Sequence, residues 1–211
     1  MKPNERTLAI EGLAGIIETK VEAPDDPKGL ALVCHPHPLF GGTNDNKVVQ
    51  ILTSTFIRLD FAVLRPNFRG VGTSQGMYDQ GRGETNDMLA VLDEARRIFG
   101  ELPIVLAGFS FGAHVQTCVA RSLDESGQSA KRLVLVGTAV GPVEGVRYHT
   151  PNVAKDTLVI HGTDDVTVPL SNVLAWAEPQ DLPIIVIPGA DHFFHRRLHI
   201  IRDIVLRAWT Y

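Results

Sequence analysis

A serine flanked by glycines carries the strongest chemical signal in the chain. The pentapeptide Gly108-Phe109-Ser110-Phe111-Gly112 follows the apolar run PIVLA (103–107) and precedes a segment with helical spacing. A G-x-S-x-G sequence between a strand and a helix forms a sharp turn that exposes the serine hydroxyl at the edge of a sheet. The helix that follows directs its N-terminus at any anion that develops there. The pattern predicts that Ser110 is a nucleophile.

A serine hydroxyl needs a general base, and that base needs an acid that orients it. Candidates for both follow later apolar runs: DTLVIHG (156–162) leads into Asp164 and Asp165, and PIIVIPG (183–189) leads into His192. Because the carboxyl ends of parallel strands meet at one edge of a sheet, we expect the serine, an aspartate and the histidine to converge. The two adjacent aspartates leave the identity of the acid open.

The other histidines do not form a convincing metal site. His35 and His37 have H-x-H spacing, but the prolines beside them favour a structural role for His35. His195 and His199 follow His192 at helical spacing, among arginines that disfavour a bound cation. We therefore expect neither a metal nor an organic cofactor.

Two glycine-rich loops, 41–44 and 69–74, lack the spacing of phosphate-binding motifs, so nucleotide binding is not predicted. The second loop is expected to form a tight turn. Arg69 is expected to be buried there in contact with a carboxylate, with Asp87 as the expected partner.

Short apolar, β-branched runs alternate with segments of helical periodicity. Continuous apolar runs of this length are typical of strands that are covered on both faces. Their alternation with helices predicts an α/β fold with a doubly wound, mostly parallel sheet. The expected strands are 30–36, 61–68, 103–110, 132–139, 156–162 and 183–189, and the expected helices are roughly 44–59, 84–99, 112–124, 170–177 and 193–209.

Two segments stand outside this alternation. Residues 7–24 are expected to form an antiparallel hairpin at the sheet edge, with a turn near 12–15. The connection 141–155 has two prolines and no helical pattern, and it is too short for a cap domain. We expect it to overhang the carboxyl ends of the strands, where ligands bind in open α/β sheets. No repeat or long linker is evident, so residues 1–211 are interpreted as one domain.

The composition excludes several classes of protein. The 211 residues include 20 Lys and Arg against 24 Asp and Glu, a formal net charge of −4, which disfavours a nucleic-acid partner. No apolar run is long enough to span a membrane or to resemble a signal peptide, so a cytoplasmic protein without a membrane partner is expected. Cys34 and Cys118 lie in apolar runs and are expected to be buried free thiols.

Together, these motifs resemble the small serine α/β-hydrolases that lack a cap, close to the dienelactone-hydrolase-like esterases. The similarity extends over nearly the whole chain, with two departures. Pro36 stands where glycine commonly follows the histidine, and Asn67 stands where aspartate commonly opens the D-x-R-G-x-G-x-S pattern. The matching segments are CHPHPLFGGTNDNKVV (34–49), RPNFRGVGTSQG (65–76), GFSFGA (108–113), HGTDDVTVP (161–169) and ADHFFH (190–195).

The resemblance implies roles for several residues. Related hydrolases carry the triad acid in the pattern H-G-x-x-D-x-x-V-P, which assigns it to Asp165. One oxyanion donor is expected to be the backbone N–H of Phe111, the residue after the nucleophile. The second oxyanion donor is expected to be the backbone N–H of His37, with the backbone N–H of Leu39 as the alternative. Leu39 and Phe40 are expected to line the substrate pocket.

The implied activity is hydrolysis of small carboxylic esters or thioesters through an acyl-enzyme. Ser110 would attack the carbonyl, His192 would act as the base, and Asp165 would orient it. A cofactor-free perhydrolase would keep the same triad and differ in its pocket. A non-catalytic ligand-binding protein on the same fold is the alternative outside the enzymes. The expected partner is a small-molecule ester, and the sequence leaves the oligomeric state open.

Overall fold

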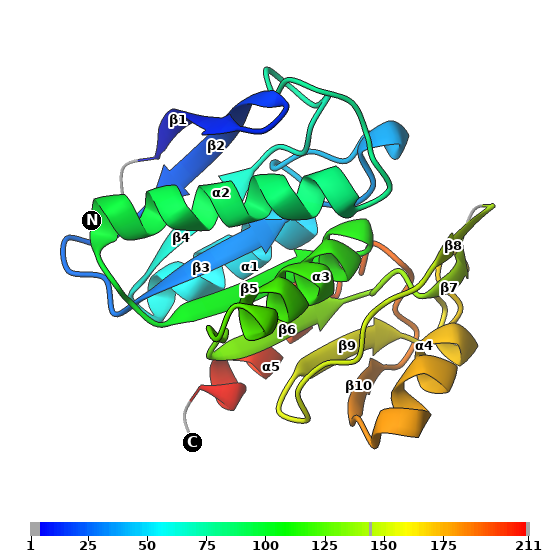
Figure 1. The fold of residues 1–211 in the computed structure, drawn as a ribbon. Coiled ribbons are helices and arrows are strands. Elements are labelled where there is room, and N and C mark those ends of the chain that lie inside the picture. The colour runs from blue at the N-terminus through cyan, green and yellow to red at the C-terminus, as the bar shows by residue number, and fades with distance from the viewer. Residues whose placement is uncertain (1–4, 144, 210–211) are drawn as a thin grey trace.

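The computed structural model describes residues 5–143 and 145–209, whose strands form a large mixed sheet with helices on both faces (Figure 1). Within these residues the eight-stranded sheet has the order β1-β2-β4-β3-β5-β6-β9-β10. The β1–β2 and β2–β4 pairs are antiparallel and the others are parallel, which confirms the predicted fold class and its N-terminal hairpin. The strands are β1 (Arg6–Gly12), β2 (Gly15–Glu22), β3 (Gly29–Cys34), β4 (Phe61–Pro66), β5 (Ile104–Phe109), β6 (Arg132–Val136), β9 (Leu158–Gly162) and β10 (Ile184–Ile187).

Helices cover the two faces of the sheet in separate layers, each with its own apolar core. The helices α2 (Arg82–Phe99), α3 (Phe111–Glu125) and α4 (Leu170–Ala177) pack on one face. The helices α1 (Lys47–Arg58) and α5 (Leu198–Ala208) pack on the other. Because both faces are covered, every residue of β3, β4 and β5 is buried, and these strands read as continuous apolar runs. None of the helices in the described ranges is long and apolar enough to cross a membrane.

The last helix begins at Leu198, so the prediction that it starts at residue 193 is wrong. The Asp191 carboxylate accepts a hydrogen bond from the His195 N–H at 3.0 Å and contacts the His195 ring at 2.6 Å. Phe194 has a φ of 53°, which no helix accommodates. A turn held by local hydrogen bonds therefore replaces the first helical residues, in spite of their periodicity.

The connection between β6 and β9 contains a hairpin that the sequence did not predict. Its strands are β7 (Gly141–Val143) and β8 (Val146–Tyr148), which pair with each other and not with the main sheet. Three-residue strands are too short for their periodicity to be visible. The described part of this connection holds no further helix or strand, and so no cap domain. Two short 3₁₀ helices complete the structure, η1 (Pro38–Phe40) and η2 (Glu178–Gln180).

Two further predictions concern the partner of Arg69 and the burial of the two cysteines. Arg69 and Asp87 form the expected ion pair: Nε and Nη2 of Arg69 each lie 2.8 Å from one carboxylate oxygen of Asp87, which is only 2% exposed. Both cysteines are free, but only Cys34 is fully buried, and Cys118 is half-buried. Burial raises the pKa of both thiols, so neither is a ready nucleophile.

Candidate active site

Ser110 occupies a strained turn between β5 and α3. Its φ of 56° and ψ of −118° lie outside the regions that non-glycine residues favour. The turn is possible because the glycines on either side leave room for backbone. A Cβ on Gly108 would lie 2.4 Å from the carbonyl oxygen of Gly112, and a Cβ on Gly112 would lie 2.4 Å from that of His35. The chain thus presents the Ser110 hydroxyl at the carboxyl end of the sheet.

A continuous chain of hydrogen bonds leads away from this hydroxyl. The Ser110 Oγ lies 3.0 Å from Nε2 of His192, and Nδ1 of His192 lies 2.7 Å from Oδ2 of Asp165. All three side chains are buried. Oδ1 of Asp165 accepts hydrogen bonds from the N–H groups of Thr167 and Val168, at 3.0 and 2.7 Å, which fixes the carboxylate. With its proton on Nδ1, His192 is oriented to accept one from Ser110 at Nε2.

Two other aspartates near these strand ends, Asp164 and Asp191, point elsewhere. The Asp164 carboxylate accepts a hydrogen bond from the Thr163 hydroxyl at 2.7 Å. The Asp191 carboxylate contacts His195, as described above. Of the three aspartates near these strand ends, the structure brings only Asp165 into contact with His192.

A second histidine lies beside the Asp165 carboxylate. His161 is fully buried, and its Nε2 lies 2.9 Å from the Val168 carbonyl and 3.4 Å from Oδ2 of Asp165. Burial lowers the pKa of His161, so the ring is neutral and donates from Nε2 to that carbonyl. The ring thus supports the loop that carries Asp165. His161 opens the H-G-x-x-D pattern, but no local feature of the sequence indicates that its ring lies against the carboxylate of Asp165.

The loop after β3 is held from inside by His35. Its Nδ1 lies 2.7 Å from the Pro36 carbonyl, and its Nε2 accepts a hydrogen bond from the Phe68 N–H at 2.9 Å. Both ring nitrogens are therefore used by the neutral imidazole. Burial lowers the pKa of His35 to about 4, which keeps the ring uncharged at neutral pH.

The backbone N–H groups of His37 and Phe111 have no acceptor among the described residues. Phe111 is the first residue of α3, and first-turn N–H groups lack intrahelical partners. The Leu39 N–H, the reserve oxyanion donor, already donates to Nδ1 of His37 at 3.2 Å. The His37 and Phe111 rings lie 5.1 Å apart, which brings the two segments together.

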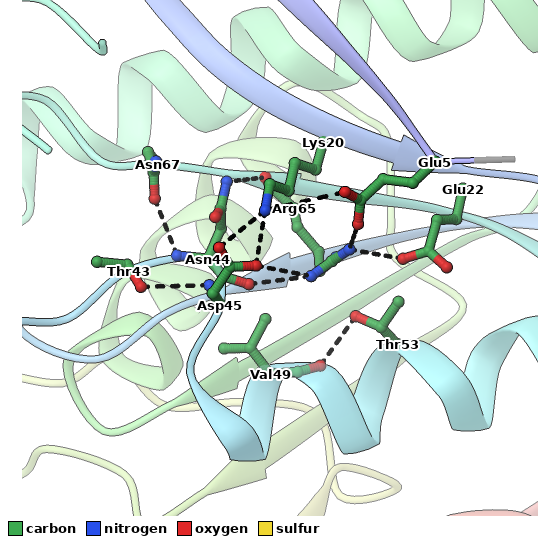
Figure 2. Close-up of polar contacts among 10 residues, drawn as sticks. All are labelled: Glu5, Lys20, Glu22, Thr43, Asn44, Asp45, Val49, Thr53, Arg65 and Asn67. Atoms are coloured by element: carbon green, nitrogen blue, oxygen red, sulfur yellow. Dashed lines mark hydrogen bonds and ion pairs between the residues drawn. The ribbon is translucent and has the colours of Figure 1, made fainter. Parts of the chain in front are cut away.

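Figure 2 shows how the segment behind this loop is anchored to the sheet. The Asn44 N–H donates to Oδ1 of Asn67 at 2.9 Å, and the Asn44 amide donates to the Arg65 carbonyl at 3.1 Å. The buried guanidinium of Arg65 donates to the Asn44 carbonyl at 3.1 Å and pairs with Glu22 at 2.6 Å and with Glu5. Since Arg65 lies on β4 and Glu22 on β2, two strands fix the position of Asn44.

The asparagine at position 67, one of the two departures from the family pattern, is explained by the groups that its side chain contacts. Its amide hydrogen-bonds to the Glu18 carboxylate, which also accepts the Thr73 N–H at 2.6 Å. These hydrogen bonds, with that from the Thr73 N–H the strongest, lower the pKa of Glu18. An aspartate at position 67 would place a second carboxylate against Glu18, whereas asparagine donates to Glu18 and accepts from Asn44 at once.

The predicted pocket residues Leu39 and Phe40 are exposed, and the Phe40 ring packs 4.6 Å from that of His37. Leu39 and Phe40 are 67% and 62% exposed, and Phe193 beside His192 is 48% exposed. Large apolar side chains at this exposure offer contact area to an apolar substrate group. Phe111 is buried instead, and its ring packs 6.0 Å from that of Tyr148 on the hairpin. The hairpin therefore contacts the site, as expected for this connection.

The remaining histidines do not gather into a metal centre. His195 and His199 are exposed, and no group of three or more His, Cys, Asp or Glu side chains in the described ranges has the geometry to hold a metal ion.

The solved structures that this chain resembles include serine hydrolases. A serine hydrolase homologue from Coxiella burnetii is 35% identical, with a TM-score of 0.82 over 99% of this chain and 98% of that one. A serine hydrolase without a lid from Xanthomonas campestris is 31% identical, with a TM-score of 0.85 over 97% and 93%. A dienelactone hydrolase from Anabaena variabilis, 15% identical, shares the fold at a TM-score of 0.75 over 100% and 98%. The resemblance to capless serine α/β-hydrolases is confirmed.

The family described as serine aminopeptidase, S33 matches residues 25–156, more than half of the chain, and this protein belongs to it. The matched range includes Ser110 and its flanking glycines. It ends before Asp165 and His192, so the contacts of His192 with Ser110 and with Asp165 are given by the geometry and not by the family match.

Proposed function

We propose that this protein hydrolyses small carboxylic esters or thioesters through an acyl-enzyme. The observation that carries the proposal is the buried hydrogen-bond chain from Ser110 through His192 to Asp165, with links of 3.0 and 2.7 Å. A ligand-binding protein without activity has no need for a strained serine turn and an oriented base, because both serve only nucleophilic attack.

In the acylation step, the Ser110 Oγ attacks the carbonyl carbon of the substrate while Nε2 of His192 takes the hydroxyl proton. The Asp165 carboxylate stabilises the resulting imidazolium through Nδ1–H. The imidazolium then gives its proton to the departing alcohol or thiol, and the acyl-enzyme remains. Water, activated by His192, attacks the acyl-enzyme in the same way and releases the acid.

The negative charge on the tetrahedral intermediate requires donors that are already in place. The N–H groups of Phe111 and His37, which have no acceptor in the described residues, are the proposed pair. The hydrogen bonds that hold His35 and Asn44 fix the loop that carries the His37 N–H. Loss of one such donor typically costs about 2.7–4 kcal/mol of transition-state stabilisation.

Reaction with a fluorophosphonate probe tests the chemistry directly. The native protein should be labelled at Ser110, and Ser110→Ala should abolish the labelling. Ser54→Ala, a change of the same type on α1, is the matched control and should leave labelling intact. A native protein that folds but neither reacts with the probe nor cleaves 4-nitrophenyl acetate would contradict the proposal and favour a binding role.

A substrate series tests the proposed substrate class. Leu39 and Phe40 are exposed and the described residues form no cap, so neutral acyl chains should stop gaining from burial, at roughly 0.8 kcal/mol per CH₂, once they extend past these side chains. We expect kcat/KM for neutral 4-nitrophenyl esters to peak at short chains. A rate that keeps rising to long-chain esters, or faster cleavage of aminoacyl 4-nitroanilides than of esters, would overturn this part of the proposal.

A further inference from the structure

A groove beside the proposed reaction centre has no role in the mechanism above. It lies between the start of α2, one side of α3 and the β8 strand of the hairpin, which are marked in Figure 1. Gly81 and Thr85 line it from the first element, His114 and Cys118 from the second, and Tyr148 from the third. Its volume of about 520 Å³ is in the range of small-molecule sites. We call it the basic groove.

The charged lining of the basic groove is entirely positive. Arg82, Arg121 and Arg147 line it, and none of its described lining residues is Asp or Glu. Arg82 pairs with Asp79 at 3.0 Å and Arg121 lies 3.8 Å from Glu125, but these pairs are exposed and contribute little. Arg147 forms no ion pair with a described residue. A concave surface with charges of one sign attracts ligands of the other sign, so the basic groove should take an anion.

The basic groove begins close to the nucleophile. Its wall includes His114, whose N–H donates to the Ser110 carbonyl at 3.2 Å. The buried Phe111 ring packs against this wall, with its centroid 6.2 Å from that of His114 and 6.0 Å from that of Tyr148. From His114 to Arg121 the helix α3 rises about 10 Å. A substrate chain that joins Ser110 to the arginines therefore has to pass over the Phe111 ring and along α3.

The position of His192 decides which part of a substrate enters. The leaving group must lie against Nε2 of His192, because that atom returns the proton. The His192 ring packs against Phe109 and Phe193, whereas Phe111 packs against Tyr148, which lines the basic groove. The acyl portion, and not the leaving group, is therefore the part directed toward the basic groove.

We propose that the substrate is an acyl ester or thioester whose acyl chain ends in an anionic group, a carboxylate or a phosphate, which the arginines of the basic groove bind. This inference rests on the proposed function for the position of the scissile bond. It names the substrate class that the site prefers.

Paired chromogenic esters test the proposal. The carboxylate pair is the 4-nitrophenyl monoester of suberic acid and its methyl-capped neutral twin. The pair that stands in for a phosphate is the phosphonate 4-nitrophenyl 8-phosphonooctanoate and its neutral dimethyl phosphonate ester. The native enzyme should favour the charged member of at least one pair by about tenfold in kcat/KM, through KM, as expected for charge-assisted hydrogen bonds in a wet groove. Whichever pair shows the larger ratio identifies the anion.

Variants of the basic groove should lower that ratio toward one. Arg121→Gln and Arg147→Gln each remove one charge from the lining, and the double variant, which keeps only Arg82 there, should remove most of the preference. Arg97→Gln, the same change on α2 but outside the groove, is the matched control and should keep the ratio. Equal rates on the two members of both pairs in the native enzyme would overturn the proposal, and so would a preference that is undiminished in the double variant.

Binding separates failure of this proposal from failure of the proposed function. Titration calorimetry on Ser110→Ala should show that octyl phosphate or octanoate binds more tightly than 1-octanol, with the difference lost in the Arg121→Gln, Arg147→Gln background. Anion binding without hydrolysis of any ester would retain the basic groove and overturn the esterase. Hydrolysis of the neutral esters with no binding of either anion would retain the esterase and overturn the anion-binding role of the basic groove.

Discussion

At the scale of single residues, the adjacent aspartates Asp164 and Asp165 provide the sharpest test of the proposed mechanism. They carry the same functional group, yet only Asp165 contacts His192. Asp165→Asn keeps the shape of the side chain but presents an amide, which removes the negative charge and the preference for a proton on Nδ1 of His192. We expect kcat for 4-nitrophenyl acetate to fall by about 10⁴-fold.

Asp164→Asn is the matched control, because its carboxylate accepts only from the neighbouring Thr163 hydroxyl. It should change kcat by no more than a small factor. Equal losses in the two variants would contradict the assignment of Asp165, and a larger loss at Asp164 would reverse it.

At the scale of the elements, Asn67 joins three segments of the chain. Asn67 itself follows β4. Its side chain accepts a hydrogen bond from the Asn44 N–H, in the segment before α1, and donates one to the Glu18 carboxylate on β2. Asn67→Asp should lower the free energy of unfolding by about 1–3 kcal/mol, because a buried donor is replaced by a charge that faces Glu18. Urea unfolding at pH 7 measures the loss.

The double variant with Glu18→Gln provides the control. The new side chain keeps an oxygen for the Thr73 N–H and turns an amide toward the new aspartate, so most of the lost stability should return. If Asn67→Asp costs the same in the Glu18→Gln background as in the native protein, the repulsion between carboxylates is not the cause.

At the scale of the whole molecule, buried neutral histidines make stability depend on pH. Burial lowers the pKa of both His35 and His114 to about 4, whereas both titrate near 6.5 in the unfolded chain. Between these values the unfolded chain binds more protons, so stability must fall as the pH falls. Acidification from pH 7 to pH 5 should cost about 2 kcal/mol for each such histidine.

Urea unfolding of the native protein and of His35→Gln at the two pH values isolates this effect. The variant should be less stable at pH 7, because it loses hydrogen bonds to Pro36 and Phe68, but its stability should fall less on acidification. A pH dependence that is the same in both proteins would contradict the assignment of a neutral, buried His35.

The local patterns of the sequence determined the architecture. Apolar runs and helical periodicity predicted the order of strands and helices, because burial on two faces or on one dictates which positions are apolar. The serine turn was also predictable from its local pattern, since Gly108 lies against the backbone of Gly112 within the turn itself, whereas the contact of Gly112 with Cys34 and His35 comes from the fold. The pattern around Asp165 singled out one aspartate through a resemblance, and no local rule could have done so.

The tertiary structure alone decided the contacts between segments that are distant in the chain. It brought Asp165 and not Asp164 to His192, and it set Glu18 against Asn67, which explains a departure from the family pattern. The arginines of the basic groove come from α2, α3 and β8, and none of them has a recognisable motif. Periodicity reports whether a side chain is buried, but only the packing of one element on another determines which side chain it meets.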